Sequence, residues 1–163
     1  MNWYVLFTLS HKTNQIVTNL NRRDDIEAFV PLYEFYYRKT KEYIIRPMFP
    51  NYIFIKTHYN QLDFNVLIQK MGEEKDGLIR QLSKDDVSAL RKEEIEMFDL
   101  LLDSDHVVRM SQAYLQDGKA KVIEGPLKSF EKQIVKVDVH NQYAYLDLIF
   151  MNRRIKVGLK INR

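Results

Sequence analysis

Hydrophobic and polar residues follow two different patterns along the chain. In the first two thirds, short apolar runs with many aromatic residues alternate with segments of helical spacing. Residues 3–9 have the length and composition of a buried strand. Residues 11–23 place Ile16, Val17 and Leu20 on one face of a helix, with Ser10 where it can cap the first turn. The chain therefore begins with a strand followed by a helix.

The same two periodicities continue to residue 102. The expected elements are a strand over 26–37, a hairpin tip over 38–42, a returning segment over 43–56, a helix over 60–71, a strand over 77–82 and a helix over 83–102. Ser83 opens the last helix, and Asp85 and Asp86 stand in its first turn. This order predicts a ferredoxin-like, split β-α-β domain over residues 1–102.

Strict alternation replaces helical spacing near the C-terminus. The side chains expected to point inward are Val135, Val137, Val139, Ala144, Leu146, Leu148, Phe150, Ile155, Val157, Leu159 and Ile161. Arg154, Lys156 and Lys160 point the other way. Short strands joined by tight turns predict a small curled β-barrel over residues 118–163. Residues 103–117 show little periodicity and are expected to be a linker. The predicted fold class is α+β.

Composition is consistent with a folded protein of the reducing cytosol. The 163 residues are 45% hydrophobic and include 10 tyrosines and 9 phenylalanines, enough for a packed core. There is no cysteine, so disulfides and thiolate metal sites are excluded. The N-terminus has no basic leader, and no apolar run has membrane-spanning length. We expect a cytoplasmic monomer that does not contact membranes.

Charge is segregated along the chain. Residues 106–163 carry 11 lysines and arginines against 5 aspartates and glutamates, whereas residues 57–105 carry 6 against 12. Such segregation is typical of proteins that bind polyanions at chosen places, although solvated faces can also simply differ in charge.

The residue types of catalysis do not gather in any known motif. His11, His58, His106 and His140 show no metal-ligand spacing, and the five glycines form no phosphate-binding loop. No nucleophile elbow is visible. We expect neither an enzyme nor a cofactor or metal site.

Two stretches resemble a known family. Residues 46–55 read Arg-Pro-Met-Phe-Pro-Asn-Tyr-Ile-Phe-Ile, and residues 123–127 read Ile-Glu-Gly-Pro-Leu. Further matches are Trp3-Tyr4-Val5-Leu6, Phe29-Val30-Pro31, Gly118 and Val122. Over nearly its full length the chain resembles NusG-type transcription elongation factors, most closely the specialised antiterminator paralogs of the LoaP and RfaH type. The resemblance implies an N-terminal NGN domain and a C-terminal SH3-like KOW barrel. Ser129 and Lys132 depart from the family, which usually has glycine at these places.

The resemblance implies that the N-terminal domain binds the clamp coiled coil of RNA polymerase. Residues at the rims of the predicted strands can remain partly exposed and are our candidates for this contact: Phe7, Phe49, Pro50, Ile79 and Leu82. Strand aromatics are also common in cores, and prolines can serve only to shape a strand entry.

Two further surfaces suit nucleic acids. Lys12, Gln15, Asn19, Arg22 and Arg23 form a polar, cationic stripe without acids on the first helix, and similar paralogs present this helix to non-template DNA. The expected outer face of the barrel carries Lys119, Lys121, Lys128, Lys132, Tyr143, Arg153, Arg154 and Lys156, with Tyr145 nearby, and suits nascent RNA. Ordinary solvated faces remain the alternative for both surfaces.

The sequence therefore favours an antitermination factor that rides RNA polymerase. Three alternatives remain: a general NusG-type factor that couples polymerase to Rho or the ribosome, a KOW-type ribosomal RNA-binding protein, and a ligand-binding regulatory domain on a ferredoxin-like fold.

Overall fold

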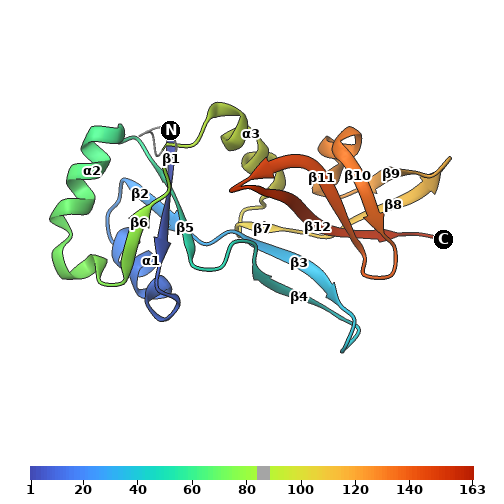
Figure 1. Ribbon diagram of the computed structural model, residues 1–163, viewed down its shortest axis with the longest axis horizontal. Coiled ribbons are helices and arrows are strands. Elements are labelled where there is room, and N and C mark those ends of the chain that lie inside the picture. The colour runs from blue at the N-terminus through green and yellow to red at the C-terminus, as the bar shows by residue number, and fades with distance from the viewer. Residues whose placement is uncertain (84–88) are drawn as a thin grey trace. The chain divides into compact units, whose positions relative to one another are not determined.

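The structure is a computed structural model that describes residues 1–83 and 89–163 (Figure 1). The chain forms two compact units, each built from two separate segments. The first unit contains Met1–Pro31 and Phe49–Ile95, and the second contains Leu32–Met48 and Glu96–Arg163. The segment Leu32–Met48, expected within the N-terminal domain, thus belongs to the same unit as the C-terminal strands.

A four-stranded antiparallel sheet forms the centre of the first unit. Its strands are β1 (Asn2–Thr8), β2 (Ile26–Phe29), β5 (Tyr52–Thr57) and β6 (Leu78–Gln81), in the order β2-β5-β1-β6. Each neighbouring pair is antiparallel. Together with the helices after β1 and β5, this order confirms the ferredoxin-like prediction.

The helices of the first unit begin differently from one another. α2 (Gln61–Lys70) is capped by Asn60, whose side chain accepts a hydrogen bond of 2.8 Å from the Asp63 amide. α1 (Thr13–Asn21) follows a short 3-10 helix, η1 (Ser10–Lys12), and neither N-cap residue makes a side-chain capping bond. The prediction that Ser10 caps this helix was therefore wrong, because Ser10 is the first residue of a preceding turn. A second 3-10 helix, η2 (Gly72–Lys75), follows α2.

The two faces of this sheet bury different kinds of side chain. Apolar residues of β1, β2 and β5 form one core with α1 and α2: Tyr4, Leu6, Ile16, Leu20, Ile26, Ala28, Ile53, Ile55, Phe64, Ile68 and Met71. On the other face, Trp3 packs edge-on against Phe29 and Phe54, at centroid distances of 5.9 and 6.5 Å. The sheet is thus buried on both faces at its centre, as the apolar pattern of residues 52–56 predicted.

A break at Pro31 divides the strand predicted over residues 26–37. β2 ends at Phe29, and β3 (Leu32–Tyr37) begins after Pro31, in the second unit. Proline has no amide hydrogen to donate, so it suits such a junction. β3 pairs with β4 (Glu42–Pro47) as a hairpin and with β7 (Val107–Val108) in parallel.

The remaining strands of the second unit form a five-stranded sheet in the order β10-β11-β12-β8-β9. Its strands are β8 (Ser111–Gln116), β9 (Lys119–Glu124), β10 (Ile134–Asp138), β11 (Tyr143–Phe150) and β12 (Arg153–Ile161). The inward row of β11 and β12 is confirmed, since Leu146, Phe150 and Val157 are buried. Val135, expected to point inward, is 49% exposed, because a register shift between Ile134 and Lys136 interrupts the alternation.

The segment expected as a linker is ordered structure. Residues 103–117 contain β7 and β8, and β8 pairs with β12 and β9. These strands were missed because β7 has only two residues and because β8 is buried only at its start. The helix predicted over 83–102 corresponds to α3 (Lys92–Leu101), and its predicted first turn with Asp85 and Asp86 lies outside the described residues.

The tight turn at Gly125 joins β9 to a 3-10 helix, η3 (Pro126–Gln133). Gly125 has a φ of 102°, and a Cβ atom there would lie 2.6 Å from the Cα of Ser111. The Ser111 hydroxyl accepts a hydrogen bond of 3.0 Å from the Leu127 amide. Ser129 and Lys132, at the unusual positions, are exposed within η3, and neither is among the residues with positive φ. Among positions 125, 129 and 132, the backbone of this chain therefore requires glycine only at position 125.

Candidate functional site

Four of the five side chains predicted to contact polymerase lie on or next to β1 and the edge strand β6. Phe7 lies between Tyr52 on β5 and Arg80 on β6, its paired neighbours across the sheet. Its ring centroid is 4.8 Å from that of Tyr52 and 5.7 Å from the Arg80 guanidinium. Ile79 is 49% exposed in the register shift of β6. The sequence did not identify Tyr52 and Arg80 as members of this surface. Their pairing with Phe7 is known only from the strand register.

Pro50 and Leu82 lie close to the same edge. The turn that contains Pro50 is held to β1 because the Thr8 amide donates a hydrogen bond of 2.9 Å to the Asn51 carbonyl. Leu82 follows β6 directly, and its amide donates a hydrogen bond of 2.8 Å to the Val5 carbonyl. Pro50 is exposed and Leu82 is half-buried. We call Phe7, Pro50, Tyr52, Ile79, Arg80 and Leu82 the β1–β6 edge surface.

Phe49 does not belong to this surface. It is only 4% exposed, and its ring stacks on Phe54 with a centroid distance of 6.0 Å and an interplanar angle of 7°. The proline-braced turn therefore directs Phe49 into the aromatic layer of the first unit. Its side chain serves the core in this structure, in line with the common behaviour of strand aromatics.

The cationic stripe of α1 is partly neutralised by acids that lie far away in the sequence. Lys12 Nζ is 2.9 Å from a carboxylate oxygen of Asp76, and Arg23 Nη2 is 3.2 Å from Glu74 Oε1. Both acids come from η2 or the residue that follows it. The stripe was predicted to be free of acids because helical spacing relates only residues of the same helix, and these acids belong to another element.

Asn19 has a structural role in the same place. It is 7% exposed, donates a hydrogen bond of 2.9 Å to the Glu74 carbonyl and accepts one of 3.0 Å from Gln15. Asn19 is therefore not available as a contact for a base edge. Arg22, at the end of α1, is exposed and is the cation of the stripe that we keep as a candidate for nucleic-acid contact.

On the five-stranded sheet, tyrosines and lysines meet on one face of β10, β11 and β12. Lys136, Tyr145 and Lys156 are direct cross-strand partners. Lys156 Nζ is 4.5 Å from the ring centroid of Tyr143, and Lys136 Nζ is 5.8 Å from that of Tyr145. The two rings meet edge to face with centroids 5.6 Å apart. Burial raises the pKa of Tyr143, and the neighbouring Tyr145 and Asp138 raise it further.

The other cations predicted for the barrel lie on other elements or at the start of β12. Lys119 and Lys121 are on β9, Lys128 and Lys132 on η3, and Arg153 and Arg154 at the start of β12. Of these, only Lys121 is half-buried and the rest are exposed. Lys136, which the sequence prediction missed, belongs with Tyr143, Tyr145 and Lys156 because the strand register brings it there.

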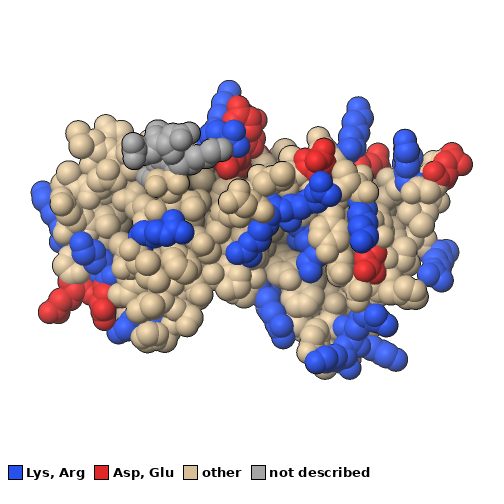
Figure 2. Space-filling view, viewed as in Figure 1, with Lys and Arg blue, Asp and Glu red and all other residues tan. Residues whose placement is uncertain are grey.

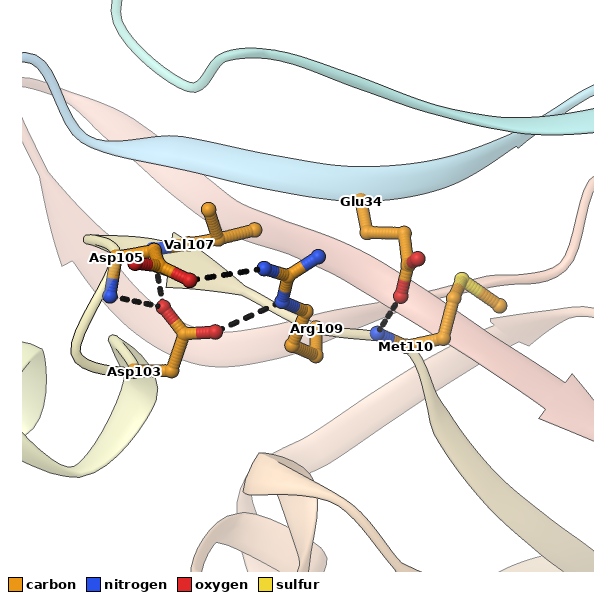
Figure 3. A network of polar contacts seen from close by, with 6 residues as sticks. All are labelled: Glu34, Asp103, Asp105, Val107, Arg109 and Met110. Carbon is orange, nitrogen blue, oxygen red and sulfur yellow. Dashed lines mark hydrogen bonds and ion pairs between the residues drawn. The ribbon is translucent and has the colours of Figure 1, made fainter.

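A polar network ties the hairpin to the segment before β8 (Figure 3). Arg109 Nε donates a hydrogen bond of 2.7 Å to Asp103 Oδ2, and its Nη2 lies 3.5 Å from Asp105. The other oxygen of Asp103 accepts hydrogen bonds of 2.9 Å from the amides of Asp105 and Val107.

The hairpin joins this network at Glu34. Its Oε1 accepts a hydrogen bond of 2.9 Å from the Met110 amide (Figure 3). Parallel pairing of β3 with β7 runs beside this contact. The segment before β8 is therefore fixed to the hairpin by both main-chain and side-chain hydrogen bonds.

The network makes the stability of the second unit depend on pH. Burial acts to raise the pKa of Asp103, but the hydrogen bonds from Arg109 and two amides outweigh it, and the pKa lies below its ordinary value. A depressed folded-state pKa means that the stabilisation is complete above the unfolded-state value of about 3.9 and is lost as the pH falls through the folded-state value.

We expect Asp103→Asn to lower the free energy of unfolding at pH 7, and the deficit relative to the wild type to shrink below about pH 4. Urea unfolding of both proteins between pH 7 and pH 3 measures this. Asp105→Asn is the control, since Asp105 is 75% exposed and makes only the longer contact. An equal deficit at both ends of the pH range would contradict the prediction.

Neither a metal centre nor a membrane span is found among the described residues. Within them, no group of three or more His, Asp or Glu side chains is placed to hold a metal ion. No helix in the same part of the chain is long and apolar enough to cross a membrane.

Comparisons with known proteins agree with this architecture. Residues 1–99 match a family model described as "Transcription termination factor nusG". Among solved structures, the chain is similar to one reported as "Domain interaction in Thermotoga maritima NusG", with a TM-score of 0.57 and 16% sequence identity. That likeness covers 98% of this chain and 93% of the Thermotoga chain, and at this identity it shows the fold. No curated protein sequence matches this chain significantly.

Proposed function

Because this chain belongs to the NusG family of transcription factors, we propose that it is an elongation factor that binds RNA polymerase and makes transcription resistant to termination. Proteins of this family bind RNA polymerase and act without catalysis. The proposed mechanism is therefore stoichiometric. A factor bound across the polymerase clamp would hold it closed and disfavour pausing, and nucleic-acid contacts would select where the factor loads.

The observation that carries the proposal is the β1–β6 edge surface of the first unit. Phe7 is half-buried between Tyr52 and Arg80, so its ring is held rigidly while part of it stays accessible. Ile79, in the register shift of the neighbouring strand β6, adds an exposed apolar side chain. Rigid aromatic and arginine side chains surrounded by apolar contacts are the usual anchors of protein interfaces. We propose that this surface binds the clamp coiled coil.

Nucleic-acid contacts form the second part of the proposal. The cluster of Lys136, Tyr143, Tyr145 and Lys156 combines cations with aromatic rings, which suits nascent RNA. Arg22 at the end of α1 is the candidate for a phosphate of non-template DNA. The acids that pair with Lys12 and Arg23 weaken the case for the rest of the stripe.

A second candidate function is that of a general NusG-type factor that couples polymerase to Rho or the ribosome. The description of the matching family as a termination factor favours it. The two candidates predict opposite effects at a terminator, so a single assay separates them.

The test is in vitro transcription across an intrinsic terminator and across a Rho-dependent terminator. We expect the wild-type protein to increase read-through at both. Phe7→Ala is expected to weaken polymerase binding about 30-fold, as for an anchor worth about 2 kcal/mol, and to remove the effect. Ile79→Ala, at a more exposed position, should weaken binding without affecting the core.

Leu62→Ala is the matched control, because Leu62 is 71% exposed on α2 and is not one of the residues of the β1–β6 edge surface. It should bind polymerase like the wild type. Increased termination with Rho would replace the proposal by the second candidate. Unchanged binding by both Phe7→Ala and Ile79→Ala would exclude the β1–β6 edge surface as the polymerase contact.

A further inference from the structure

The tip of the β3–β4 hairpin contacts the turn between β10 and β11. The Tyr43 hydroxyl donates a hydrogen bond of 2.7 Å to Gln142 Oε1, across 99 residues of sequence. Arg38 Nη1 lies 3.5 Å from Asn141 Oδ1 in the same way. We call Arg38, Lys39, Lys41, Tyr43, Asn141 and Gln142 the tip–turn surface. The surface therefore consists of residues from the hairpin tip and residues from the turn, joined by these two contacts.

The turn that receives the hairpin is itself held firmly. Asp138 accepts hydrogen bonds of 2.9 Å from both the amide and the side chain of Asn141. These bonds, the backbone one first, lower the pKa of Asp138. The Gln142 carbonyl accepts a hydrogen bond of 2.8 Å from the Leu159 amide. Gln142 is therefore a fixed point to which Tyr43 is attached.

Tyr43 presents an aromatic ring that is both fixed and exposed. Its hydroxyl is bonded to Gln142, and its ring lies 5.3 Å from that of Tyr36 at an angle of 50°. The residue is nevertheless 44% exposed. Ordering an already fixed ring costs little conformational entropy on binding, so such a ring suits the stacking of a planar ligand.

At the hairpin tip that carries this ring, exposed cations outnumber the one exposed acid, Glu42. Arg38, Lys39 and Lys41 are all exposed at the tip of the hairpin. Figure 2 shows lysine and arginine side chains gathered where the β3–β4 hairpin ends, with little acidic surface among them. Lys156, over the ring of Tyr143 at the start of β11, adds a cation on the five-stranded sheet. A polyanion would be attracted to this place from several directions.

We propose that the tip–turn surface binds single-stranded RNA. An unpaired base would stack on Tyr43, and the neighbouring phosphates would lie against Lys39 and Lys41. A base inside a duplex is already stacked on both sides, so an exposed ring favours an unpaired strand. Gln142 Oε1 accepts from Tyr43, but the side-chain amide of Gln142 also carries N–H donors that can bind a 2′-hydroxyl, the group that distinguishes RNA from DNA.

This site extends the nucleic-acid part of the proposed function to a hairpin outside the five-stranded sheet. It does not depend on polymerase, and it is tested with the full-length protein alone. The probe is a fluorescein-labelled 12-nucleotide oligouridine, and its dissociation constant is measured by fluorescence anisotropy at several salt concentrations. The same length of oligodeoxythymidine and a 12-base-pair RNA duplex serve as comparison ligands.

Tyr43→Ala is expected to weaken binding of the oligouridine about tenfold, the effect of losing one stacked base. Tyr43→Phe keeps the ring and should retain most of the affinity, which separates stacking from the bond to Gln142. Lys39→Gln combined with Lys41→Asn should reduce the slope of log affinity against log salt by about 1.4, since each lost phosphate contact with a single strand contributes about 0.7. Asparagine is chosen at position 41 because Lys41 has a φ of 58°, which asparagine tolerates.

Lys70→Gln combined with Arg163→Gln is the charge-matched control, because both residues are exposed and lie outside the tip–turn surface. The salt slope of this control should stay close to that of the wild type. Unchanged oligouridine affinity in Tyr43→Ala, or duplex RNA bound as tightly as the single strand, would overturn the proposal. Equal affinity for oligodeoxythymidine would overturn the assignment to RNA. If the wild-type protein binds the oligouridine but does not bind polymerase, this inference is supported and the proposed function is refuted.

Discussion

Gly158→Val is expected to lower the free energy of unfolding of the second unit by about 3 kcal/mol, the upper range for overfilling a packed site. A Cβ atom at Gly158 would lie 2.7 Å from the Glu34 carbonyl oxygen and 2.2 Å from the Met110 sulfur. The Met110 side chain can move aside, but the Glu34 oxygen is part of the β3 main chain. The added methyl groups must therefore push the hairpin away from β12.

The displacement has a local consequence that can be measured separately. The Met110 amide donates a hydrogen bond to Glu34, so its hydrogen exchange should accelerate in Gly158→Val. Urea unfolding followed by circular dichroism gives the change in free energy. Lys160→Val, on the same strand with an exposed side chain, is the control and should be nearly neutral. Unchanged exchange at Met110 in Gly158→Val would show that the hairpin is not packed as described.

Phe64→Ala is expected to lower the free energy of unfolding of the first unit by about 3–5 kcal/mol, the usual cost of removing a buried phenylalanine. Phe64 is fully buried on α2, and its ring stacks on Tyr4 with a centroid distance of 4.2 Å and an interplanar angle of 4°. The Tyr4 hydroxyl is fixed by a hydrogen bond of 2.8 Å to the Tyr59 carbonyl. Tyr4 therefore cannot move to fill the cavity without losing that bond.

Trp3 gives a direct signal for this experiment. It is the only tryptophan of the chain, is 2% exposed and lies in the first unit, so its fluorescence follows unfolding of that unit. Val66→Ala, at a position 39% exposed on the same helix, should change stability by no more than about 0.5 kcal/mol. A loss below about 1 kcal/mol in Phe64→Ala would mean that the core of α2 and β1 is less tightly packed than the structure shows.

Much of the fold follows from local patterns. The elements of the first unit and the inward row of Leu146, Phe150 and Val157 were predicted because periodicity repeats over several residues of one strand or helix. The β12 cations Lys156 and Lys160 were placed on the outside for the same reason, and both are exposed. The prediction failed at Val135, where a register shift in β10 breaks the repeat, and at β7, which is too short to show one.

The surroundings of the candidate side chains were predicted less well than the fold. Phe49 follows the sequence pattern of an exposed strand rim, yet it is buried against Phe54. The stripe on α1 contains no acid of its own, yet Asp76 and Glu74 reach it from η2. Both errors have one cause, because the partners involved belong to other elements, and only packing brings them close.

By itself, the sequence determined the kinds and order of the elements in the first unit, the alternating strands near the C-terminus, the family resemblance and the lack of catalytic motifs. These properties depend on short stretches of chain, such as residues 46–55 and 123–127, in which residues that are close in sequence are also close in space. Only the tertiary structure decided that the hairpin Leu32–Met48 packs with the C-terminal strands and that Tyr43 meets Gln142. Contacts over such separations depend on how whole elements fill space together, and no local pattern encodes them.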